Sequence, residues 1–444
     1  NNYSNPGPNQ QTLTINRLAN GTFQLQGIPL QSATNPNGPT AAQVQTLGAA
    51  ALNNVTGGPG IPADLFTLAR NNPPVAALTN ALDPEFRVPS QWRISGSVDV
   101  RADLGFLGDD WNLGADVIWS RVKDGLEYRD LRLNPNGTLP DGRQRWVVRD
   151  ASLGGNPDLL LTNTDKGYSW NIVARFDKRW TNGFRVGGSY TFQRARDVQS
   201  GTSSIALSNV SNAASGINPN AAAYGISNYQ TDNAYRLVVS YDHKLFGDNN
   251  TRIELFFNSR AGQRFSYTMN DGTMGNTNNG AVFGTLGNNN RNLLYVPNVA
   301  SRTADTRVTY NMTDAQFAQF QALVLGSPLE KYQGGIAPKN IGQSGRFNKL
   351  DLSIRQEVPF VFGGKIELFA DMENVLNFIN PNWGQVNRIG FPGYASVVSV
   401  ACAPTNAITS PCTQYVYSSP RNPTDTRIVT PSLWQLRLGA RLSF

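Results

Sequence analysis

The last thirteen residues, 432–444, constrain the fold of this chain more than any other segment. Side chains on a β-strand point alternately to its two faces. From position 434 onward the even positions are all apolar, with an aromatic residue at each end of the set: Trp434, Leu436, Leu438, Ala440, Leu442 and Phe444. The odd positions include two arginines, Arg437 and Arg441. This pattern is typical of a transmembrane β-strand, with lipid on one face and a polar lumen on the other.

A single strand of this kind is also compatible with a soluble β-sandwich, so the choice between the two folds depends on the rest of the chain. Eight more segments alternate in the same way: 92–104, 111–119, 168–180, 184–192, 235–245, 253–257, 350–358 and 366–372. Trp170 and Trp180 lie ten residues apart on one face, as Trp434 and Phe444 do. At about 3.3 Å per residue and a tilt of roughly 40°, ten residues rise about 25 Å, the height of an outer-membrane apolar band. The sequence predicts an all-β fold, a transmembrane antiparallel up-and-down β-barrel.

Connection lengths alternate as well. Short turns are expected at 107–110, 181–183, 247–250 and 359–364, and long connections at 120–167, 197–232, 269–345 and 379–431. The first long connection has room for a further, weaker hairpin. Outer-membrane barrels have short periplasmic turns and long extracellular loops, so we expect an outer-membrane protein with a periplasmic C-terminus. Residues 90–444 would form the C-terminal half of the barrel, and residues 1–89 an extracellular loop or less regular barrel strands.

Composition excludes two other classes of protein. No stretch approaches the roughly 18 apolar residues of a membrane helix, although a barrel is compatible with the mean hydropathy of −0.36. The net charge of +7 is a feature of nucleic-acid-binding proteins. However, the basic residues are dispersed and no nucleic-acid motif is present. We therefore expect the lipid bilayer, and no nucleic acid, as a partner. The chain begins Asn-Asn-Tyr-Ser-Asn without an export leader, so we expect further residues before Asn1 in the precursor.

The sequence offers no catalytic or cofactor chemistry. It has one histidine, His243, which is too few for a two-histidine metal site, and which we place near a short turn at the membrane interface rather than in a catalytic triad. Cys402 and Cys412 are expected to form a disulfide, with free thiols as the alternative. Enzyme activity and a bound cofactor are not expected. The asparagine-rich run at 270–290 leaves calcium binding open, without a recognised calcium motif.

Other polar and aromatic residues receive structural interpretations. Acidic and basic residues on the polar faces of the last strands predict an ion-pair network in the lumen rather than acid–base catalysis: Glu357, Glu367, Asp371 and Glu373 with Arg355, Lys365, Arg437 and Arg441. Thr313 and Gln316 predict a helix start, whose stripe Phe317, Phe320 and Val324 would pack on its own loop or contact a ligand. The same two interpretations apply to four loop aromatics: Tyr224, Tyr229, Trp383 and Tyr415.

Several segments resemble one family of membrane proteins. The last strand resembles the outer-membrane assembly signal, and 369–382, F-A-D-M-E-N-V-L-N-F-I-N-P-N, resembles an element in the penultimate strand of TonB-dependent receptors. Five further segments resemble the Oar-like branch of these receptors: 83–87, 163–170, 178–183, 188–191 and 292–297. The resemblance is scattered over residues 83–444.

The resemblance implies a 22-stranded barrel with an N-terminal plug that engages TonB, ExbB and ExbD of the inner membrane. Such receptors bind an extracellular ligand and import it with energy from the proton gradient. These 444 residues contain neither a recognisable plug nor a TonB-contacting segment, and nine strands do not close such a barrel. We expect the missing barrel half and plug before Asn1, in the same or another chain. A structural or adhesive surface barrel and a passive porin remain the alternatives, and the ligand is unknown.

Overall fold

The computed structural model describes residues 14–26, 30–33, 35–36, 38–53, 79–149, 157–199, 201–272, 279–287, 290–360 and 364–443. Its largest element is a sheet of nine long antiparallel strands, each paired with the next of the nine along the chain. They are β4 (Ser90–Ala102), β5 (Trp111–Asp130), β9 (Tyr168–Arg179), β10 (Phe184–Asp197), β12 (Asn233–Phe246), β13 (Asn249–Arg260), β20 (Phe347–Pro359), β21 (Lys365–Glu373) and β26 (Gln435–Ser443). All nine predicted strands are present.

The register of this sheet keeps apolar side chains beside apolar ones. One row crosses six neighbouring strands through Phe184, Tyr241, Ile253, Ile354, Ala370 and Leu438. The next row, one residue along each strand, runs through Arg185, Ser240, Glu254, Ser353, Asp371 and Arg437. A slip of one residue would exchange the two faces, so the alternation in the sequence specifies the register.

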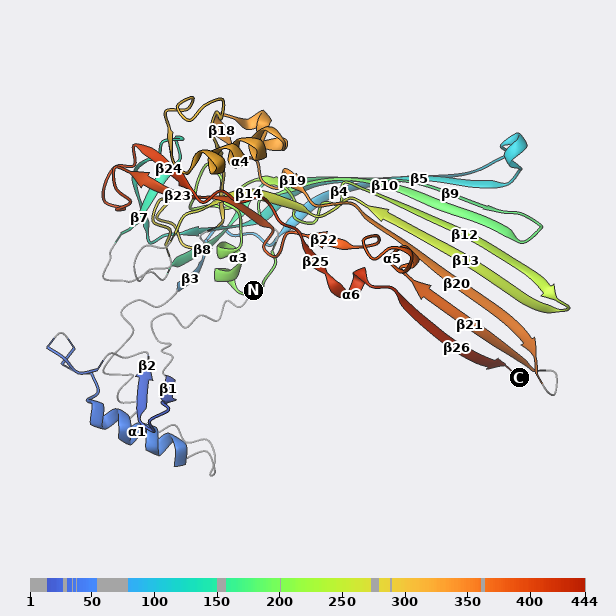
Figure 1. Cartoon of the computed structure of the whole chain (residues 1–444), viewed down its shortest axis with the longest axis horizontal. Helices are drawn as coiled ribbons and strands as arrows, with labels where there is room; N and C mark the ends of the chain where they lie inside the picture. Colours follow the sequence, from blue (N-terminus) through green and yellow to red (C-terminus); the bar gives the residue numbers. More distant parts are fainter. Residues whose placement is uncertain are drawn as a thin grey trace.

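Short turns and long connections lie at opposite ends of the sheet, as predicted (Figure 1). The β4–β5 turn contains a 3₁₀ helix, η3 (Gly105–Leu107). The β9–β10 turn depends on Gly183, whose φ of +91° is a conformation that residues with a Cβ rarely adopt. The C-terminal strand β26 ends at the short-turn end (Figure 1).

The nine strands form an open sheet rather than a closed barrel. Within the described residues, β4 pairs with β5 alone and β26 with β21 alone, so both outer strands have a free edge. Free edges leave backbone N–H and C=O groups that lipid cannot satisfy. The strand count of the complete barrel therefore stays a prediction.

The four long connections fold together into one body, which we call the cap (the described parts of residues 131–167, 198–232, 261–346 and 374–434; Figure 1). Its helices are α3 (Ala206–Ser211), α4 (Asp314–Leu325), η5 (Pro328–Tyr332), α5 (Val375–Ile379) and α6 (Val429–Ser432). Its strands are β6 (Leu133–Thr138), β7 (Gln144–Val148), β8 (Asp158–Thr164), β11 (Gly225–Ile226), β14 (Arg264–Asn270), β15 (Asn292–Leu293), β16 (Tyr295–Val296), β17 (Val308–Asn311), β18 (Gly335–Ile336), β19 (Gly342–Gln343), β22 (Val386–Arg388), β23 (Tyr394–Ala403), β24 (Gln414–Ser418) and β25 (Thr426–Ile428).

The largest hydrophobic core of the described residues lies in the cap. Strands β14, β23, β24 and β17 bring the third and fourth connections into one sheet. Residues such as Met269, Val397 and Tyr417 are completely buried there. The weaker hairpin expected in the first connection is present as β6 and β7. The helix predicted from Thr313 is present as α4, with its capping box, and its stripe of Phe317, Phe320 and Val324 is buried.

Residues before β4 contribute no further membrane strand among those described. β1 (Thr14–Arg17) and β2 (Phe23–Gln26) form a hairpin, against which α1 (Ala41–Asn53) packs through Val44 and Leu25. β3 (Thr79–Leu82) pairs in parallel with β8 of the cap. Across the described ranges, none of the helices has the length and apolar character needed to cross a membrane.

Candidate functional site

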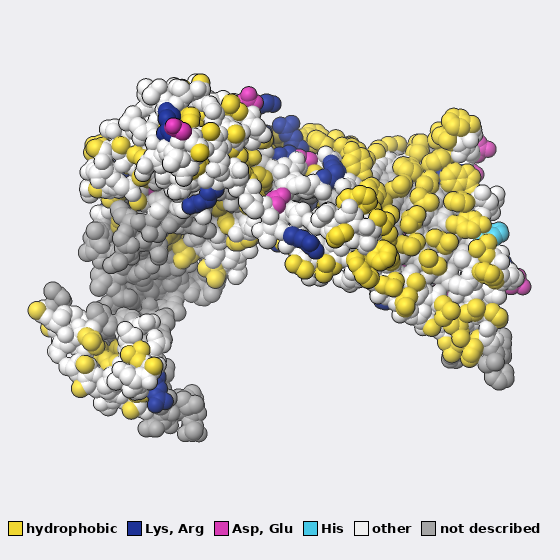
Figure 2. All heavy atoms as spheres, in the orientation of Figure 1, with side chains coloured by type: hydrophobic (Ala, Val, Ile, Leu, Met, Phe, Trp, Pro, Cys, Tyr) yellow, Lys and Arg dark blue, Asp and Glu magenta, His cyan; other side chains and the backbone are white. Residues whose placement is uncertain are grey.

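One face of the nine-stranded sheet is a continuous apolar surface (Figure 2). Its side chains are exposed to an extent that soluble proteins avoid: Ile94 is 66% exposed and Leu438 is 69% exposed. The face extends from β4 to β26, because the paired rows place apolar residues side by side on successive strands. A surface of this extent and regularity fits the hydrocarbon of a bilayer.

Aromatic pairs lie at both ends of this face. Trp111 and Trp180 meet edge to face near the short turns, with ring centroids 5.9 Å apart. Trp119 and Trp170 lie beside each other at the other end, with centroids 6.3 Å apart. Amphipathic rings at two levels are the usual boundary of a membrane-spanning barrel. His243 lies near the short turns, as predicted, beside Tyr241, with 5.8 Å between ring centroids.

The opposite face carries ion pairs between neighbouring strands. Arg437 of β26 lies 2.8 Å from Asp371 of β21, and Lys365 of β21 lies 2.7 Å from Glu357 of β20. Lys349 contacts Glu373 at 3.0 Å. Glu367 lies 4.0 Å from both Arg355 and Arg441. The predicted ion-pair network is therefore present, and these carboxylates are paired with cations rather than with one another.

One ion pair reaches across an intervening strand. Asp99, Gly114 and Arg175 lie side by side on β4, β5 and β9. The Arg175 guanidinium reaches Asp99 with Nη2 2.6 Å from the carboxylate oxygen, and it also pairs with Asp116. A Cβ at position 114 would lie 2.6 Å from both Arg175 and Asp99 side-chain atoms, so only glycine leaves space for this bridge.

The predicted assembly signal occupies β26 at a free edge. Leu436, Leu438 and Leu442 are exposed on the apolar face, in register with β21, and Ala440 lies between them on the same face. Trp434 precedes the strand and packs edge to face on Phe378, with centroids 5.2 Å apart. Phe444 lies outside the described residues.

Asparagines in segment 369–382 fix the exit from β21. Asn374 adopts a left-handed conformation with φ of +56°. Its side-chain amide donates to the carbonyls of Gly384, at 2.9 Å, and Ser432, at 3.2 Å. Asn377 donates to the carbonyls of Pro381 and Trp383, each at 3.0 Å. These bonds join the last long connection to the start of β26, which explains why asparagine occurs at these positions.

A cavity of about 520 Å³ lies where the polar face of the sheet meets the cap. Arg260 of β13 and Phe347 of β20 are paired in the register and form its floor, with the guanidinium carbon 5.3 Å from the ring centroid. The cap contributes segments 228–231 and 386–392, including Tyr229 and Arg388. The described lining contains two arginines, several side-chain amides and three aromatic rings, but no carboxylate. This chemistry suits an anionic or hydrogen-bonding ligand with an apolar part.

The loop aromatics divide between packing and exposure. Tyr415 is completely buried in the cap core, so it packs. Tyr229 is 64% exposed at the cavity, whereas Trp383 is exposed away from its described lining. Part of the run considered for calcium, 273–278 and 288–289, lies outside the described residues. Asp271 of that run accepts backbone hydrogen bonds from Val282, at 2.6 Å, and Phe283, at 3.2 Å. The described residues contain no cluster of three metal-binding side chains.

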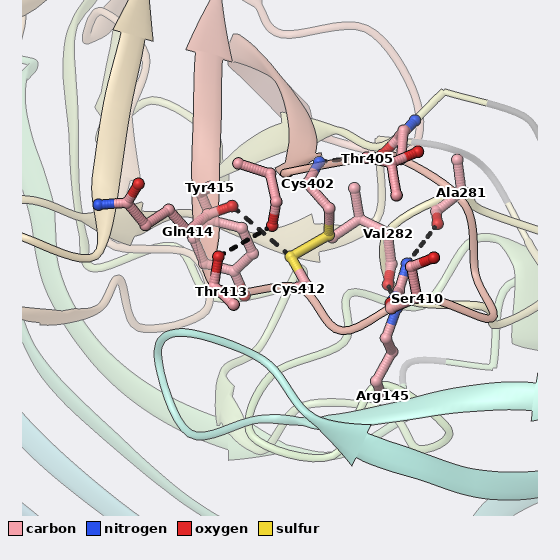
Figure 3. The surroundings of a disulfide bond; sticks show 12 residues. Arg145, Ala281, Val282, Cys402, Thr405, Ser410, Cys412, Thr413, Gln414 and Tyr415 are labelled. Carbon is pink, nitrogen blue, oxygen red and sulfur yellow. Dashed lines mark hydrogen bonds between the residues drawn. A yellow bond between two sulfur atoms is a disulfide. The ribbon is translucent and has the colours of Figure 1, made fainter.

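Cys402 and Cys412 are joined by a disulfide within the cap (Figure 3). Arg145, which is 2% exposed, reaches the same loop from the first connection. Its guanidinium donates to carbonyls of two other connections: those of Val282 at 2.8 Å, Ala281 at 3.2 Å, Ala407 at 3.3 Å and Ser410 (Figure 3). The sequence did not single out Arg145, because an arginine in a polar loop gives no local sign of burial.

The apolar face, its aromatic boundaries and the polar face with its ion pairs define a membrane-spanning β-sheet protein. A family model described as an outer membrane beta barrel domain matches residues 162–401, which is more than half of the chain. The chain belongs to this family and is an outer-membrane protein. No similar protein was found among curated proteins.

Proposed function

We propose that this chain forms part of an outer-membrane receptor that binds a ligand outside the cell and imports it with inner-membrane energy. The observation that carries the proposal is the cavity between the cap and the polar face of the sheet. A ligand held there would contact the cap and the lumen wall together. It would therefore be positioned to pass from the outer surface to the interior of the barrel.

The packing of the cap favours a receptor over a passive porin. The cavity is lined by segments that belong to folded structure, such as β22 and the buried Ile389. A fixed set of arginines and amides binds a ligand with less ordering cost than mobile loops would. A structural or adhesive barrel remains the second candidate, because a folded cap could equally bind other surface molecules.

Energy coupling in this proposal comes from partners that the family resemblance implies. A plug inside the barrel would transmit force from TonB, ExbB and ExbD. The polar face offers contacts for such a plug, because the side chains of Arg437 and Arg441 are 76% and 71% exposed while keeping their carboxylate neighbours. The proposal places the cap outside the cell and the C-terminus in the periplasm.

Planar-bilayer conductance separates the receptor from the porin. The complete polypeptide, isolated from outer membranes, is inserted into a bilayer under an applied voltage. A plugged receptor is expected to show no steady conductance, and a denaturant concentration that unfolds the plug but not the barrel is expected to open it. Large, stable conductance steps without denaturant would contradict the proposal and favour a porin.

Cross-linking in living cells separates the receptor from the adhesive barrel. A photo-reactive amino acid placed along the N-terminal periplasmic segment of the complete polypeptide is expected to trap TonB. The matched control carries the same amino acid at Asp248, in a short turn that the proposal places on the periplasmic side. Equal yields of TonB adduct from both positions, or none from either, would contradict energy coupling.

A further inference from the structure

A second hollow, of about 590 Å³, opens on the apolar face at its cap end. Trp119 and Trp170 form one side of it, and Arg121 and Tyr168 are the next paired row beyond them. Two residues along a strand advance by about 6–7 Å, so this row lies just beyond the aromatic boundary of the membrane. The hollow therefore lies at the level of lipid headgroups.

Unpaired cations surround this hollow. Arg121 and Lys166 line it, and Arg194 and Arg196 of β10 are paired in the register with Trp170 and Tyr168. Within the described residues, none of these four side chains forms an ion pair, in contrast to Arg175, Arg185 and Arg437 on the opposite face. The single carboxylate of the lining, Asp165, also lacks an ion-pair partner in the described part of the chain.

A backbone hydrogen bond and aromatic rings fix the shape of the hollow. The N–H of Val122 donates to the carbonyl of Gly167 at 3.0 Å, which fixes the turn that carries Lys166 beside Arg121. Tyr224 of the second connection also lines the hollow. Burial and the neighbouring Tyr168 raise the pKa of Tyr224, while the charges of Arg196 and Arg121 lower it. Arg346, which precedes β20 and does not line the hollow, differs from these cations because its guanidinium donates to Ser259 at 3.1 Å and to Asn233.

We propose that this hollow binds the headgroup of an anionic, phosphate-bearing lipid of the leaflet at the cap end. Cations on a lipid-facing surface are stable where they reach phosphate, and tryptophan and tyrosine rings support the adjoining glycerol and acyl region. Arg121 and Lys166 hold the phosphate, and Tyr224 donates a hydrogen bond to it. The inference rests on the membrane placement of the sheet and is independent of the proposed import.

Native mass spectrometry tests this proposal on the complete protein in detergent. Phosphatidylglycerol and phosphatidylcholine, which differ in net charge, are titrated separately, and retained lipid adducts are counted. Wild-type protein is expected to retain phosphatidylglycerol preferentially. In Arg121→Gln/Lys166→Gln the affinity is expected to fall about fivefold for each cation removed, roughly 25-fold in all.

The matched control is Arg93→Gln/Arg236→Gln, which removes two cations from the polar face, where the register places them. It is expected to retain phosphatidylglycerol as the wild type does. Both variants are first shown to keep the heat-modifiable mobility of a folded barrel. Equal retention of both lipids by the wild type, or unchanged retention in the Arg121/Lys166 variant, would overturn the proposal. Displacement of the lipid by millimolar inorganic phosphate would also overturn it, because the site would then bind the free anion.

Discussion

The sheet and the cap are stabilised by different means, although they belong to one chain. In the sheet, large apolar side chains such as Leu438 point outward and remain 69% exposed, while charged pairs line the other face. In the cap the arrangement is that of a soluble protein: Phe320 and Val397 are completely buried, and charges are paired or hydrogen-bonded inside. The bilayer must therefore keep the apolar side chains of the sheet away from water, as the hydrophobic core does for those of the cap.

Charged groups show the same contrast. Arg143 and Asp141 are fully buried in the cap, 2.6 Å apart, and the Arg143 guanidinium lies 4.5 Å from the centroid of the Phe283 ring. Lys365 and Glu357 of the sheet are 46% and 28% exposed. Losing one partner of a buried pair leaves an unsatisfied charge, whereas water screens the loss of an exposed one. The two regions should therefore respond differently to similar substitutions.

The largest effect is expected from Asp141→Ala. It leaves the Arg143 guanidinium buried without its carboxylate, which costs about 3–5 kcal/mol of folding free energy. Hydrogen exchange followed by mass spectrometry should show lost protection in the cap while the sheet keeps its protection. The control is Asp248→Asn, whose carboxylate is exposed beside Lys244 and whose loss should leave exchange unchanged. Unchanged protection in Asp141→Ala would show that the cap does not depend on this buried pair.

The next effect is expected from Leu438→Arg in the sheet. An arginine on the lipid face near the bilayer midplane costs about 2–4 kcal/mol, and assembly into vesicles should fall accordingly. Gln435→Arg places the same side chain on the polar face of the same strand and should assemble normally. The fraction of heat-modifiable protein on gels measures both. Similar assembly of the two variants would remove the distinction between the faces.

A somewhat smaller effect is expected from Cys402→Ser/Cys412→Ser. The disulfide closes a short loop, with a sequence separation of 10, and its loss should cost the cap about 2–3 kcal/mol through the entropy of the unfolded chain. Urea unfolding, followed by proteolysis of the cap, is the measurement. If the double variant and the wild type lose the cap at the same urea concentration, the hydrogen bonds of this loop, such as those from Arg145 and Asn136, hold it without the disulfide.

The smallest single effect is expected from a change of one pH unit. Burial in the cap raises the pKa of Asp271 to about 8, against the hydrogen bonds from Val282 and Phe283, which lower it. The folded state therefore holds a proton that the unfolded state releases above about pH 4. Cap stability should fall as pH rises from about 4 to 8, by at most about 1.4 kcal/mol per pH unit. Asp271→Asn should flatten this slope, and an equally steep slope in that variant would assign it to another group.

The sheet could be predicted from the sequence because lipid imposes a local rule. Each strand must alternate, so residues such as Trp170 and Trp180 reveal its face and length without knowledge of its partners. The ion pairs followed from the same alternation, because Asp371 and Arg437 share the polar face of adjacent strands. The hollow at the cap end was not predicted, since Arg121 lies beyond the segment that alternates most clearly.

The fold of the cap depends on contacts that no local pattern records. The bond from Arg145 to the carbonyl of Ser410 joins residues 265 positions apart. The cavity likewise combines Arg260 of β13 with Arg388 of β22, whose proximity depends on the complete fold. Within the cap only local features could be predicted: the hairpin of the first connection, the disulfide between Cys402 and Cys412, and α4, whose capping residues Thr313 and Gln316 lie within four positions.

Site-directed spin labelling along β20 tests most directly whether the two faces of the sheet meet lipid and lumen. Single cysteines replace Leu352, Ser353, Ile354 and Arg355 in the complete protein, whose own cysteines form the disulfide. In vesicles, the labels at 352 and 354 are expected to collide with oxygen, which concentrates in lipid, more often than those at 353 and 355. Labels at 353 and 355 should favour a water-soluble nickel complex. Equal oxygen accessibility at all four positions would contradict the membrane placement.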